Sequence, residues 1–319
     1  MKKEIKAPKF YLDRGEKISS DVIRKTTVPS DEENVFASWE ITDPISDRSF
    51  SPVKGVVHRH RDRVLFMPTS ICGVYCRFCL RRETVGEKEH ILSAQQIDAA
   101  IDYIRDHNEI WEVIFSGGDP LMLSNDKLQS LFDRLAEITH VKVIRIHTRF
   151  PVINPKRVNK SLIRVLRSAI NHKKAVYLSI HVNHVEEIDE QVEDAMALLA
   201  DNGIILISQT VLLKGVNDTA ADLGNLFRRL IENRVKPYYL HHLDLAQGTS
   251  HFRTTIAEGQ EIMTALRNEY SGLCLPTYVL DIPGGFGKVP IIMSHINMNE
   301  DGKYVIKDCS GKEHLYPVK

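Results

Sequence analysis

Residues 64–79 read VLFMPTSICGVYCRFC, an apolar segment that runs directly into a loop with three cysteines. The run Val64–Pro68 is short and apolar, as expected for a buried β-strand. Cys72, Cys76 and Cys79 follow it with the spacing Cys-x3-Cys-x2-Cys. Chemically active side chains directly after a strand are typical of α/β barrels. This stretch therefore predicts an α/β fold whose site lies at the carboxyl ends of its strands.

Five more apolar segments follow at roughly the spacing of one strand plus one helix. We predict strands at residues 111–116, 141–147, 176–181, 204–212 and 236–241. Segments with apolar residues at helical spacing follow each strand, at residues 93–104, 125–135, 161–170, 187–200, 220–233 and 258–270. Six successive βα units predict a parallel sheet with right-handed crossovers.

Polar residues and glycines gather where the predicted strands end. They are Ser116-Gly117-Gly118-Asp119, His147-Thr148-Arg149, His181, Gln209 and His242-Leu243-Asp244. The first βα loop has no Gly-x-Gly-x-x-Gly motif, which disfavours an open dinucleotide-binding sheet. We therefore predict a partial TIM-like (β/α)6 barrel. In this prediction residues 1–50 form an N-terminal extension, residues 51–293 the core with a cofactor-binding segment at its end, and residues 294–319 a polar tail.

The composition disfavours several classes of partner. The 319-residue chain has 42 Lys plus Arg and 42 Asp plus Glu, so no net charge attracts nucleic acid or an anionic membrane. The first residues, MKKEIKAPKFYLDRGEK, lack the apolar segment of a signal peptide. The most apolar run, Ile204–Leu213, is interrupted by Ser208-Gln209-Thr210, so no membrane span is expected. We expect a cytoplasmic protein.

The five cysteines favour metal or cluster binding over a disulfide framework. Three lie within eight residues, whereas Cys274 and Cys309 are isolated, and a secreted framework usually spreads an even number along the chain. Three thiolates on one loop can bind three irons of a [4Fe–4S] cluster and leave the fourth iron open for chemistry. A zinc ion that takes its fourth ligand elsewhere and a set of buried, unliganded thiols are the alternatives.

The cysteine spacing, with Phe78 just before the third cysteine, resembles the signature of radical S-adenosylmethionine enzymes. The resemblance implies that the open iron binds the amino and carboxylate groups of S-adenosylmethionine, and that one electron from the cluster releases a 5′-deoxyadenosyl radical. It also implies that Phe78 lies against the adenine ring. The segment Ser116-Gly117-Gly118-Asp119 matches the one that binds the cofactor's amino group in that family, and glycines let a backbone approach a ligand closely.

Residues 50–293 resemble the lysine 2,3-aminomutase family within that group. The matching segments are His58–Leu65, the cysteine loop with Arg81-Arg82, Ser116–Leu121, Arg145–Arg149, Gln209–Leu213, Pro237–Tyr239, His251–Arg253 and Asp281–Lys288. The resemblance implies that Lys288 forms a Schiff base with pyridoxal 5′-phosphate. It places Arg63 and Arg59 near that cofactor, with Arg63 as the phosphate partner. A solvated Lys288 and a surface Arg63 beside Asp62 are the alternatives.

The same resemblance assigns an amino-acid substrate to three charged residues. Arg81 would pair with the substrate's carboxylate, and Asp244 and Asp281 with a distal ammonium group. Two carboxylates around one ammonium indicate a basic substrate and would repel glutamate. His181 and Gln209 match polar contacts to S-adenosylmethionine. Taken singly, Asp244 and Asp281 would also suit a turn or a cap.

Together these assignments predict an isomerase that converts L-lysine to β-lysine by a 1,2-amino shift. The alternatives are the same reaction on arginine or ornithine, an iron–sulfur electron-transfer or binding protein, and a radical enzyme that modifies protein or RNA. An external one-electron reductant such as flavodoxin or ferredoxin is expected. Some relatives hold zinc with several C-terminal cysteines; this chain has one there, so we predict no zinc and a possible homo-oligomer. One family branch makes β-lysine for elongation factor P, and a compact chain is compatible with it.

Overall fold

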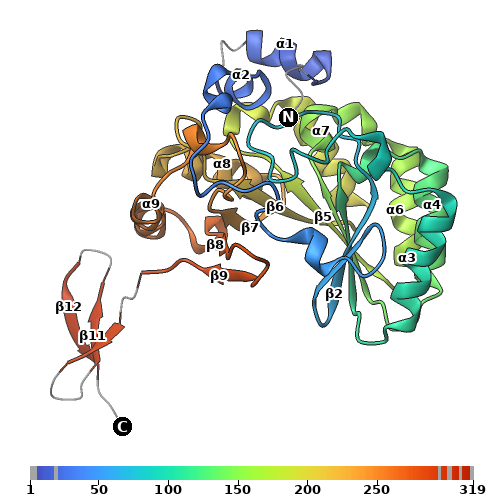
Figure 1. Cartoon of the computed structure of the whole chain (residues 1–319). Coiled ribbons are helices and arrows are strands. Elements are labelled where there is room, and N and C mark those ends of the chain that lie inside the picture. Colours follow the sequence, from blue (N-terminus) through green and yellow to red (C-terminus); the bar gives the residue numbers. More distant parts are fainter. Residues whose placement is uncertain (1–5, 18–20, 294–295, 300–303, 309–310, 317–319) are drawn as a thin grey trace.

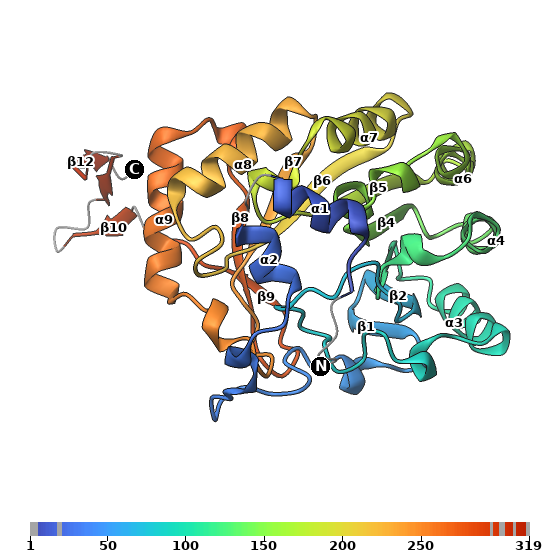
Figure 2. The same ribbon diagram turned by 90° about the horizontal axis from the view of Figure 1, so that it is seen from above.

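The strand that leads into the cysteine loop is β2 (Arg63–Thr69), part of a nine-stranded sheet whose strands lie in chain order from β1 to β9. The computed structural model describes residues 6–17, 21–293, 296–299, 304–308 and 311–316. Strands β2 to β8 are parallel, and the edge strands β1 and β9 are antiparallel to their neighbours. The sheet curls into a half-barrel with the long helices around its outside (Figure 1 and Figure 2).

All six predicted strands and all six predicted helices form. The other strands of the sheet are β1 (Val56–His60), β3 (Glu112–Gly117), β4 (Val143–Thr148), β5 (Ala175–His181), β6 (Ile205–Val211), β7 (Lys236–His241), β8 (Thr277–Asp281) and β9 (Lys288–Pro290). The outer helices are α3 (Ala94–Asp106), α4 (Asn125–Ala136), α6 (Lys160–Asn171), α7 (Glu190–Asp201), α8 (Ala220–Glu232) and α9 (Ile256–Glu269). The predicted (β/α)6 half-barrel is confirmed.

Each outer helix begins after a side chain that caps it. The caps, which accept hydrogen bonds from N–H groups of the first turn, are Ser93, Ser124, Asn159, Asp189, Thr219 and Thr255. Such a cap stabilises a helix by roughly 1 kcal/mol. The cap also explains why α7 begins at Glu190 and not at Glu187 as predicted: Asp189 supplies it, and the residues before it form a separate 3-10 turn.

The two faces of the sheet differ in polarity. The outward side chains of β3 and β4, among them Phe115 and Ile146, are buried in the core beneath the helices. Because side chains alternate along a strand, the intervening residues of β4 and β5 point inward; they are Arg145, His147, Tyr177, Ser179 and His181. A closed barrel fills this layer with branched apolar side chains. The polar inner layer here therefore marks the concave face as the site.

The loop between β8 and β9 packs against the opposite edge of the sheet. A Cβ atom at Gly287 would lie 3.4 Å from the His60 ring at the end of β1. One at Gly285 would lie 2.3 Å from the Phe50 ring. Both glycines have positive φ, at 92° and 84°, a conformation that favours glycine. This glycine-rich turn brings the two edges of the sheet together.

Sequence prediction missed β8, a seventh parallel strand, and the edge strands β1 and β9. The N-terminal extension contains α1 (Lys9–Lys17) and α2 (Asp21–Thr27), which lie above the strands (Figure 1). They are held at the end of the barrel where the cysteine loop lies, because Tyr75 N donates to Lys6 O and Arg77 N to Thr26 O.

The region predicted as a polar tail contains a separate three-stranded antiparallel sheet. Its strands are β10 (Ile296–Met298), β11 (Tyr304–Lys307) and β12 (Glu313–Tyr316). Cys309, which entered the argument about zinc, lies outside the described residues. No helix in the described part of the chain is both long and apolar enough to cross a membrane.

Candidate active site

The cysteine loop is fastened to the loop after β3 by backbone hydrogen bonds. Gly118 N donates to Thr69 O at 2.8 Å, and Asp119 N to Ile71 O at 2.9 Å. A Cβ atom at Gly118 would lie 2.3 Å from Ile71 O, and one at Gly117, whose φ is +104°, 2.6 Å from Thr69 O. The two glycines are therefore required where the two loops touch, and their contact with S-adenosylmethionine stays a prediction.

The Asp119 carboxylate holds the loop after β4. Its Oδ1 accepts hydrogen bonds from Thr148 Oγ1 at 2.7 Å and Leu121 N at 3.0 Å, and its Oδ2 from Arg149 N at 2.8 Å. Burial raises the pKa of Asp119 to about 6, although these bonds act to lower it. Asp119 thus joins the loops after β3 and β4, and its contact with S-adenosylmethionine stays a prediction, as does that of the preceding Ser116.

The three cysteines of the loop are partly buried and form no disulfide. Burial raises the pKa of Cys72 well above its usual value, and the charges of Asp119, Cys79 and Cys76 raise it further. Burial, and then the charge of Cys76, raises the pKa of Cys79 to about 11. The loop folds back on itself, since Cys79 N donates to Cys76 O at 3.1 Å, and a bound metal cluster is what would hold these thiols as thiolates. The three cysteines therefore fit a cluster.

No three His, Cys, Asp or Glu side chains in the described part of the chain converge as the ligands of one metal ion would. A [4Fe–4S] cluster makes a different demand, because its cysteine ligands bind separate irons.

Two residues assigned to S-adenosylmethionine stack on each other. The Phe78 ring lies 5.5 Å from the His181 ring at an interplanar angle of 18°. Gln209 of β6 is the register partner of His181 in β5. Burial, and then the charge of Arg149, lowers the pKa of His181 to about 3, so the ring is neutral at pH 7. The structure thus brings Phe78, His181 and Gln209 together beside the cysteine loop.

Arg81 and Arg59 meet at one buried carboxylate from the N-terminal extension. Asp47 Oδ2 lies 2.7 Å from Arg81 Nε, and Asp47 Oδ1 lies 3.1 Å from Arg59 Nη2. Arg81 Nη1 also reaches Ser116 Oγ at 3.5 Å. Burial alone would lower the pKa of Arg81, but the charge of Asp47 raises it. Asp47 therefore links the predicted cofactor arginine to the predicted substrate arginine.

Lys288 faces Asp281 across the β8–β9 pair. Lys288 Nζ lies 2.6 Å from each carboxylate oxygen of Asp281, because the two residues are register partners. Burial alone would raise the pKa of Asp281, but a hydrogen bond with His241 and the charge of Lys288 lower it to about 2. Burial and the charge of Asp281 raise the pKa of Asp244 to about 7. The two predicted substrate carboxylates are thus electrostatic neighbours of unequal acidity.

Arg63 lies at the rim of this region, and Arg59 lies inside it. The Arg63 guanidinium pairs with Asp62 at 2.7 Å and its side chain is 37% exposed, whereas that of Arg59 is 10% exposed. Burial lowers the pKa of His60, and the charges of Arg63, Arg59 and Lys288 lower it further. Both arginines and Lys288 therefore surround one histidine.

Several buried nitrogen atoms around this concave face have no hydrogen-bond partner within the described residues. Arg59 Nε and His147 Nε2 are among them. Leaving such a group unsatisfied costs roughly 1–3 kcal/mol, so both atoms suit a bound polar ligand. Burial, then the charges of Arg145 and Arg81, lowers the pKa of His147 well below its usual value. An anionic cofactor such as pyridoxal phosphate fits this group of cations around a neutral ring.

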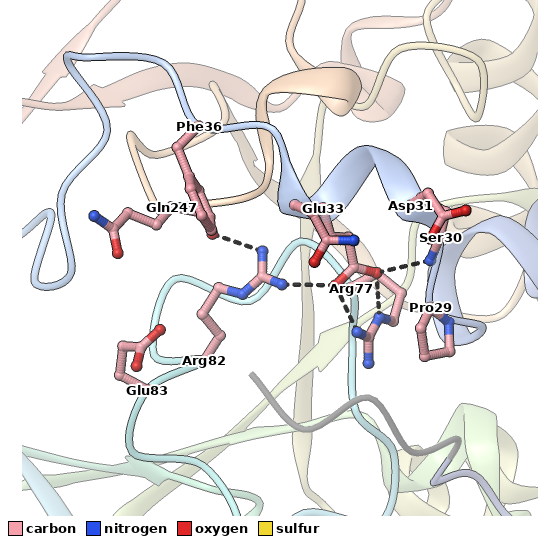
Figure 3. Close-up of a pocket in the computed structure, with 10 residues that line it drawn as sticks. Pro29, Ser30, Asp31, Glu33, Phe36, Arg77, Arg82, Glu83 and Gln247 are labelled. Atoms are coloured by element: carbon pink, nitrogen blue, oxygen red, sulfur yellow. Dashed lines mark hydrogen bonds and ion pairs between the residues drawn. The ribbon is translucent and has the colours of Figure 1, made fainter.

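A cavity of about 430 Å3 lies beside Arg77 of the cysteine loop, and Figure 3 shows that Arg77 and Arg82 in its wall are both paired with Glu33. Arg77 Nε donates to Glu33 Oε1 at 2.7 Å, and Arg82 Nη2 to Glu33 Oε2 at 2.7 Å. Burial alone would raise the pKa of Glu33, but its hydrogen bond with Arg77 and the charges of both arginines lower it. None of the predicted cofactor or substrate residues lines this cavity. The charged residues in its wall join the N-terminal extension to the cysteine loop.

Sequence reasoning missed Asp47 as a member of the site. It placed His147 and Arg149 at the end of a strand, at the predicted site edge, but assigned them no role. Asp47 belongs to a polar extension with no periodic pattern, so no local signal separates it from a surface aspartate.

Residues 66–227 match the Radical SAM superfamily. The L-lysine 2,3-aminomutase of Acetoanaerobium sticklandii is 41% identical over 292 residues, covering 92% of this chain and 70% of that protein. The L-lysine 2,3-aminomutase of Escherichia coli is 36% identical over 294 residues, covering 90% and 83%. The glutamate 2,3-aminomutase of Clostridioides difficile is 34% identical over 292 residues, covering 92% and 68%. The chain therefore belongs to the radical S-adenosylmethionine superfamily and, within it, to the lysine 2,3-aminomutase family of isomerases.

Proposed function

We propose that the protein is an L-lysine 2,3-aminomutase, which moves the amino group of L-lysine from C2 to C3 and gives β-lysine. One hydrogen atom moves from C3 to C2, so substrate and product are isomers. When bound, a [4Fe–4S] cluster with S-adenosylmethionine supplies the radical, and pyridoxal 5′-phosphate holds the migrating nitrogen. The meeting of Lys288, Asp281 and Asp244 at one end of the barrel carries the proposal.

In this proposal the cofactors are held by separate groups of residues. The cysteine loop binds the cluster, and Phe78, His181 and Gln209 contact S-adenosylmethionine together with the segment Ser116–Asp119. Lys288 binds pyridoxal phosphate covalently. Arg59 is the better placed phosphate partner because it is buried and retains a free Nε, and Arg63 supports it from the rim.

The contact between Lys288 and Asp281 supports a basic substrate. The Lys288 ammonium lies 2.6 Å from the Asp281 carboxylate. It is chemically the same group as the distal ammonium of a lysine substrate. Asp281 and Asp244 would hold the distal ammonium of the substrate by the same kind of contact. A buried cation is tolerated only beside such opposite charge.

The same carboxylates select against an acidic substrate. The side-chain carboxylate of a glutamate substrate would lie against Asp281. The pKa of Asp281 is about 2, so this residue is ionised and would repel it. Ornithine and arginine also carry a distal cation and remain the alternative substrates. They differ from lysine in length and in the shape of the cation, and charge alone does not discriminate among them.

Arg81 would bind the substrate's carboxylate by exchanging one carboxylate for another. Its present partner, Asp47, is part of the chain and lies 2.7 Å away. A guanidinium has a second pair of donors, and Arg81 Nη1 makes only a long contact with Ser116. This arrangement leaves one edge of Arg81 for the substrate.

The test is turnover by protein that is purified and loaded with iron, sulfide and pyridoxal phosphate without oxygen. It is incubated with a reductant, S-adenosylmethionine and L-lysine, L-ornithine, L-arginine or L-glutamate, and products are identified by NMR. We expect β-lysine from lysine, and its absence would overturn the proposal. β-Isomers formed only from ornithine or arginine would keep the reaction and change the substrate.

The Lys288→Ala variant separates an aminomutase from an iron–sulfur electron-transfer protein. We expect it to bind the cluster and to cleave S-adenosylmethionine, but to form no β-lysine. Lys160→Ala, at the exposed start of α6, is the matched control and should keep full turnover. If wild-type protein transfers electrons but isomerises none of the amino acids, the electron-transfer alternative holds.

The remaining partners are also part of this proposal. A flavodoxin or ferredoxin would supply the single electron, and the cytoplasm would provide the reducing environment that free thiols need. The C-terminal sheet offers a surface for a homo-oligomer. Residues 1–50, 51–293 and 294–319 serve in this view as cover, catalytic core and association segment.

A further inference from the structure

A buried arginine holds one of the proposed cluster ligands. Arg149 Nη1 donates a hydrogen bond to Cys76 Sγ at 2.9 Å. The Arg149 side chain is only 4% exposed. Its guanidinium lies 5.4 Å from the centre of the Tyr11 ring and 5.9 Å from that of Phe78. The proposed function gives this residue no task.

Glu187 and Tyr11 fix the guanidinium from its other side. Arg149 Nη2 donates to Glu187 Oε2 at 2.7 Å and to the Tyr11 hydroxyl at 2.8 Å. The Tyr11 hydroxyl in turn donates to the same Glu187 oxygen. The other oxygen, Glu187 Oε1, accepts from Asn183 N at 2.7 Å and His184 N at 3.1 Å. The arginine is therefore held in one orientation, with one nitrogen aimed at the sulfur.

The Glu187 carboxylate, which accepts a hydrogen bond from Arg149, is ionised and has several other hydrogen-bond donors. Burial alone would raise the pKa of Glu187, but the charge of Arg149 and the hydrogen bonds lower it to about 2. The negative charge of Glu187 is shared among several donors, whereas the Arg149 donor stands directly against Cys76. The nearest charge to this sulfur within the triad is therefore positive.

We propose that Arg149 is a positioning residue that raises the reduction potential of the iron–sulfur cluster through its hydrogen bond to Cys76. The inference rests on the proposed function, because it requires a cluster on the three cysteines. One electron from the external reductant increases the negative charge of the cluster and its sulfur ligands. A charged donor at 2.9 Å stabilises that reduced form more than the oxidised form.

Burial makes this hydrogen bond effective. A surface cation would be screened by water and salt, but Arg149, Glu187 and Tyr11 all lie in the interior. Tyr11 belongs to α1, which contacts the short helix α5 (Phe150–Ile153) next to Arg149. The N-terminal extension thereby reaches the immediate surroundings of a cluster ligand.

The main test is the midpoint potential of the cluster in the variant Arg149→Met with Glu187→Gln. Changing both residues avoids an uncompensated buried charge, which would threaten the fold. The potential is measured by redox titration followed by electron paramagnetic resonance, on loaded full-length protein without substrate. We expect the ratio of reduced to oxidised cluster at a fixed potential to fall at least tenfold, which is ~59 mV for one electron.

The matched control is Arg145→Met with Glu112→Gln. This pair is also buried, with Arg145 Nε 3.0 Å from Glu112 Oε1 and side chains 11% and 12% exposed. Arg145 stands four residues before Arg149, about 13 Å along the chain at 3.3 Å per residue. We expect the cluster of this control variant to keep the midpoint potential of the wild type. A drop as large as in the Arg149 variant would overturn the inference, since any lost buried pair would then have the same effect.

Two milder variants keep the inference testable if the double variant fails to fold or to bind iron. Arg149→Lys keeps the positive charge but has a single donor group. Tyr11→Phe keeps the aromatic ring but removes the hydroxyl that hydrogen-bonds to Arg149 and Glu187. We expect both to lower the potential by less than the double variant. Wild-type potentials in both, with normal iron content, would show that Arg149 only supports the loop and would overturn the inference.

The midpoint potentials can be measured whether or not the protein catalyses the aminomutase reaction. A wild-type protein that binds a cluster but makes no β-amino acid would refute the proposed function and leave the potentials open to measurement. A wild-type protein that turns over lysine while all Arg149 variants keep its potential would refute only this inference.

Discussion

At the scale of single residues, Asp244 predicts how lysine binding depends on pH. Burial and the charge of Asp281 raise its pKa to about 7. A cationic substrate binds the ionised carboxylate, so affinity should increase as pH rises through about 7. Binding should also release a proton below that pH. We expect the KM for lysine to fall roughly tenfold per pH unit below 7 and to level off above it.

The Asp244→Asn variant provides the control for this effect. It should bind lysine weakly with a KM that no longer changes through pH 7. Steady-state rates of the reconstituted enzyme between pH 6 and 8 measure both quantities. A variant that retains the wild-type slope would show that another group titrates and that Asp244 does not face the ammonium.

Replacing Asp47 should lower the free energy of unfolding, and bound ligands should partly restore it. Its carboxylate lies between Arg59 and Arg81, and all three side chains are less than one fifth exposed. Removing one member of such a buried cluster typically costs ~3–5 kcal/mol, because the remaining charges stay buried. We expect Asp47→Ala to lose this much free energy of unfolding in urea. The loss should be smaller with pyridoxal phosphate and lysine present, whose phosphate and carboxylate would face the same arginines.

A solvent-exposed ion pair provides the control for the Asp47→Ala variant. Arg234 and Asp201 lie 2.7 Å apart with side chains more than half exposed, and pairs of that kind are worth ~0–1 kcal/mol. Asp201→Ala should therefore change the unfolding free energy little. Equal losses in the two variants would argue against a buried charge cluster at Asp47.

At the scale of elements, Gly118 tests whether the loop after β3 carries the cysteine loop. Its added Cβ would meet Ile71 O at 2.3 Å and Ser70 C at 2.5 Å, both backbone atoms that cannot move without the loop. We expect Gly118→Ala to cost ~1–3 kcal/mol and to lower the iron bound per chain. Gly272→Ala has open space around its Cβ and should be within about 0.5 kcal/mol of wild type. Normal iron content in Gly118→Ala would show that the two loops move independently.

The elements that sequence reasoning predicted are those with a strong local pattern. The six βα units alternate regularly, and Ser93, Asp189 and the other caps mark helix starts in the sequence itself. The missed strands lack such a pattern. β1 reads VVHRH and β9 reads KVP, and each forms only because a neighbouring strand offers an edge. β8 is five residues long and is defined by its place beside β7.

The site divides in the same way. The cysteine motif and Lys288 were readable because each is a short linear pattern whose chemistry depends on residue type. The partners of those residues were not, because the fold alone brings them together: Asp47 is 34 residues from Arg81, and Arg149 is 73 residues from Cys76. The family resemblance favoured Arg63 as the phosphate partner, whereas burial, which appears only in the structure, favours Arg59.

At the scale of the whole molecule, the C-terminal sheet predicts self-association. Its register places Ile296 opposite Ile306 and Met298 opposite Tyr304, so these side chains share one face. Ile296 and Met298 are more than half exposed, as is Leu315 on the other face. Exposed apolar faces of this kind mark a surface that binds another protein, and Figure 1 shows β11 and β12 lying apart from the barrel.

A chain shortened after Met293 tests this expectation. The nine-stranded sheet ends at β9 and shares no strand with β10–β12, so the shortened barrel should unfold at the same urea concentration and bind the same amount of iron. We expect light scattering to give a multimer for the full chain and a monomer for the shortened one. A matched variant, Ile296→Asp with Met298→Asp, should reproduce the monomer without removing any backbone, because charged side chains cannot be buried unpaired between two copies. If the full chain is already a monomer at micromolar concentration, these apolar faces serve another partner and the homo-oligomer is ruled out.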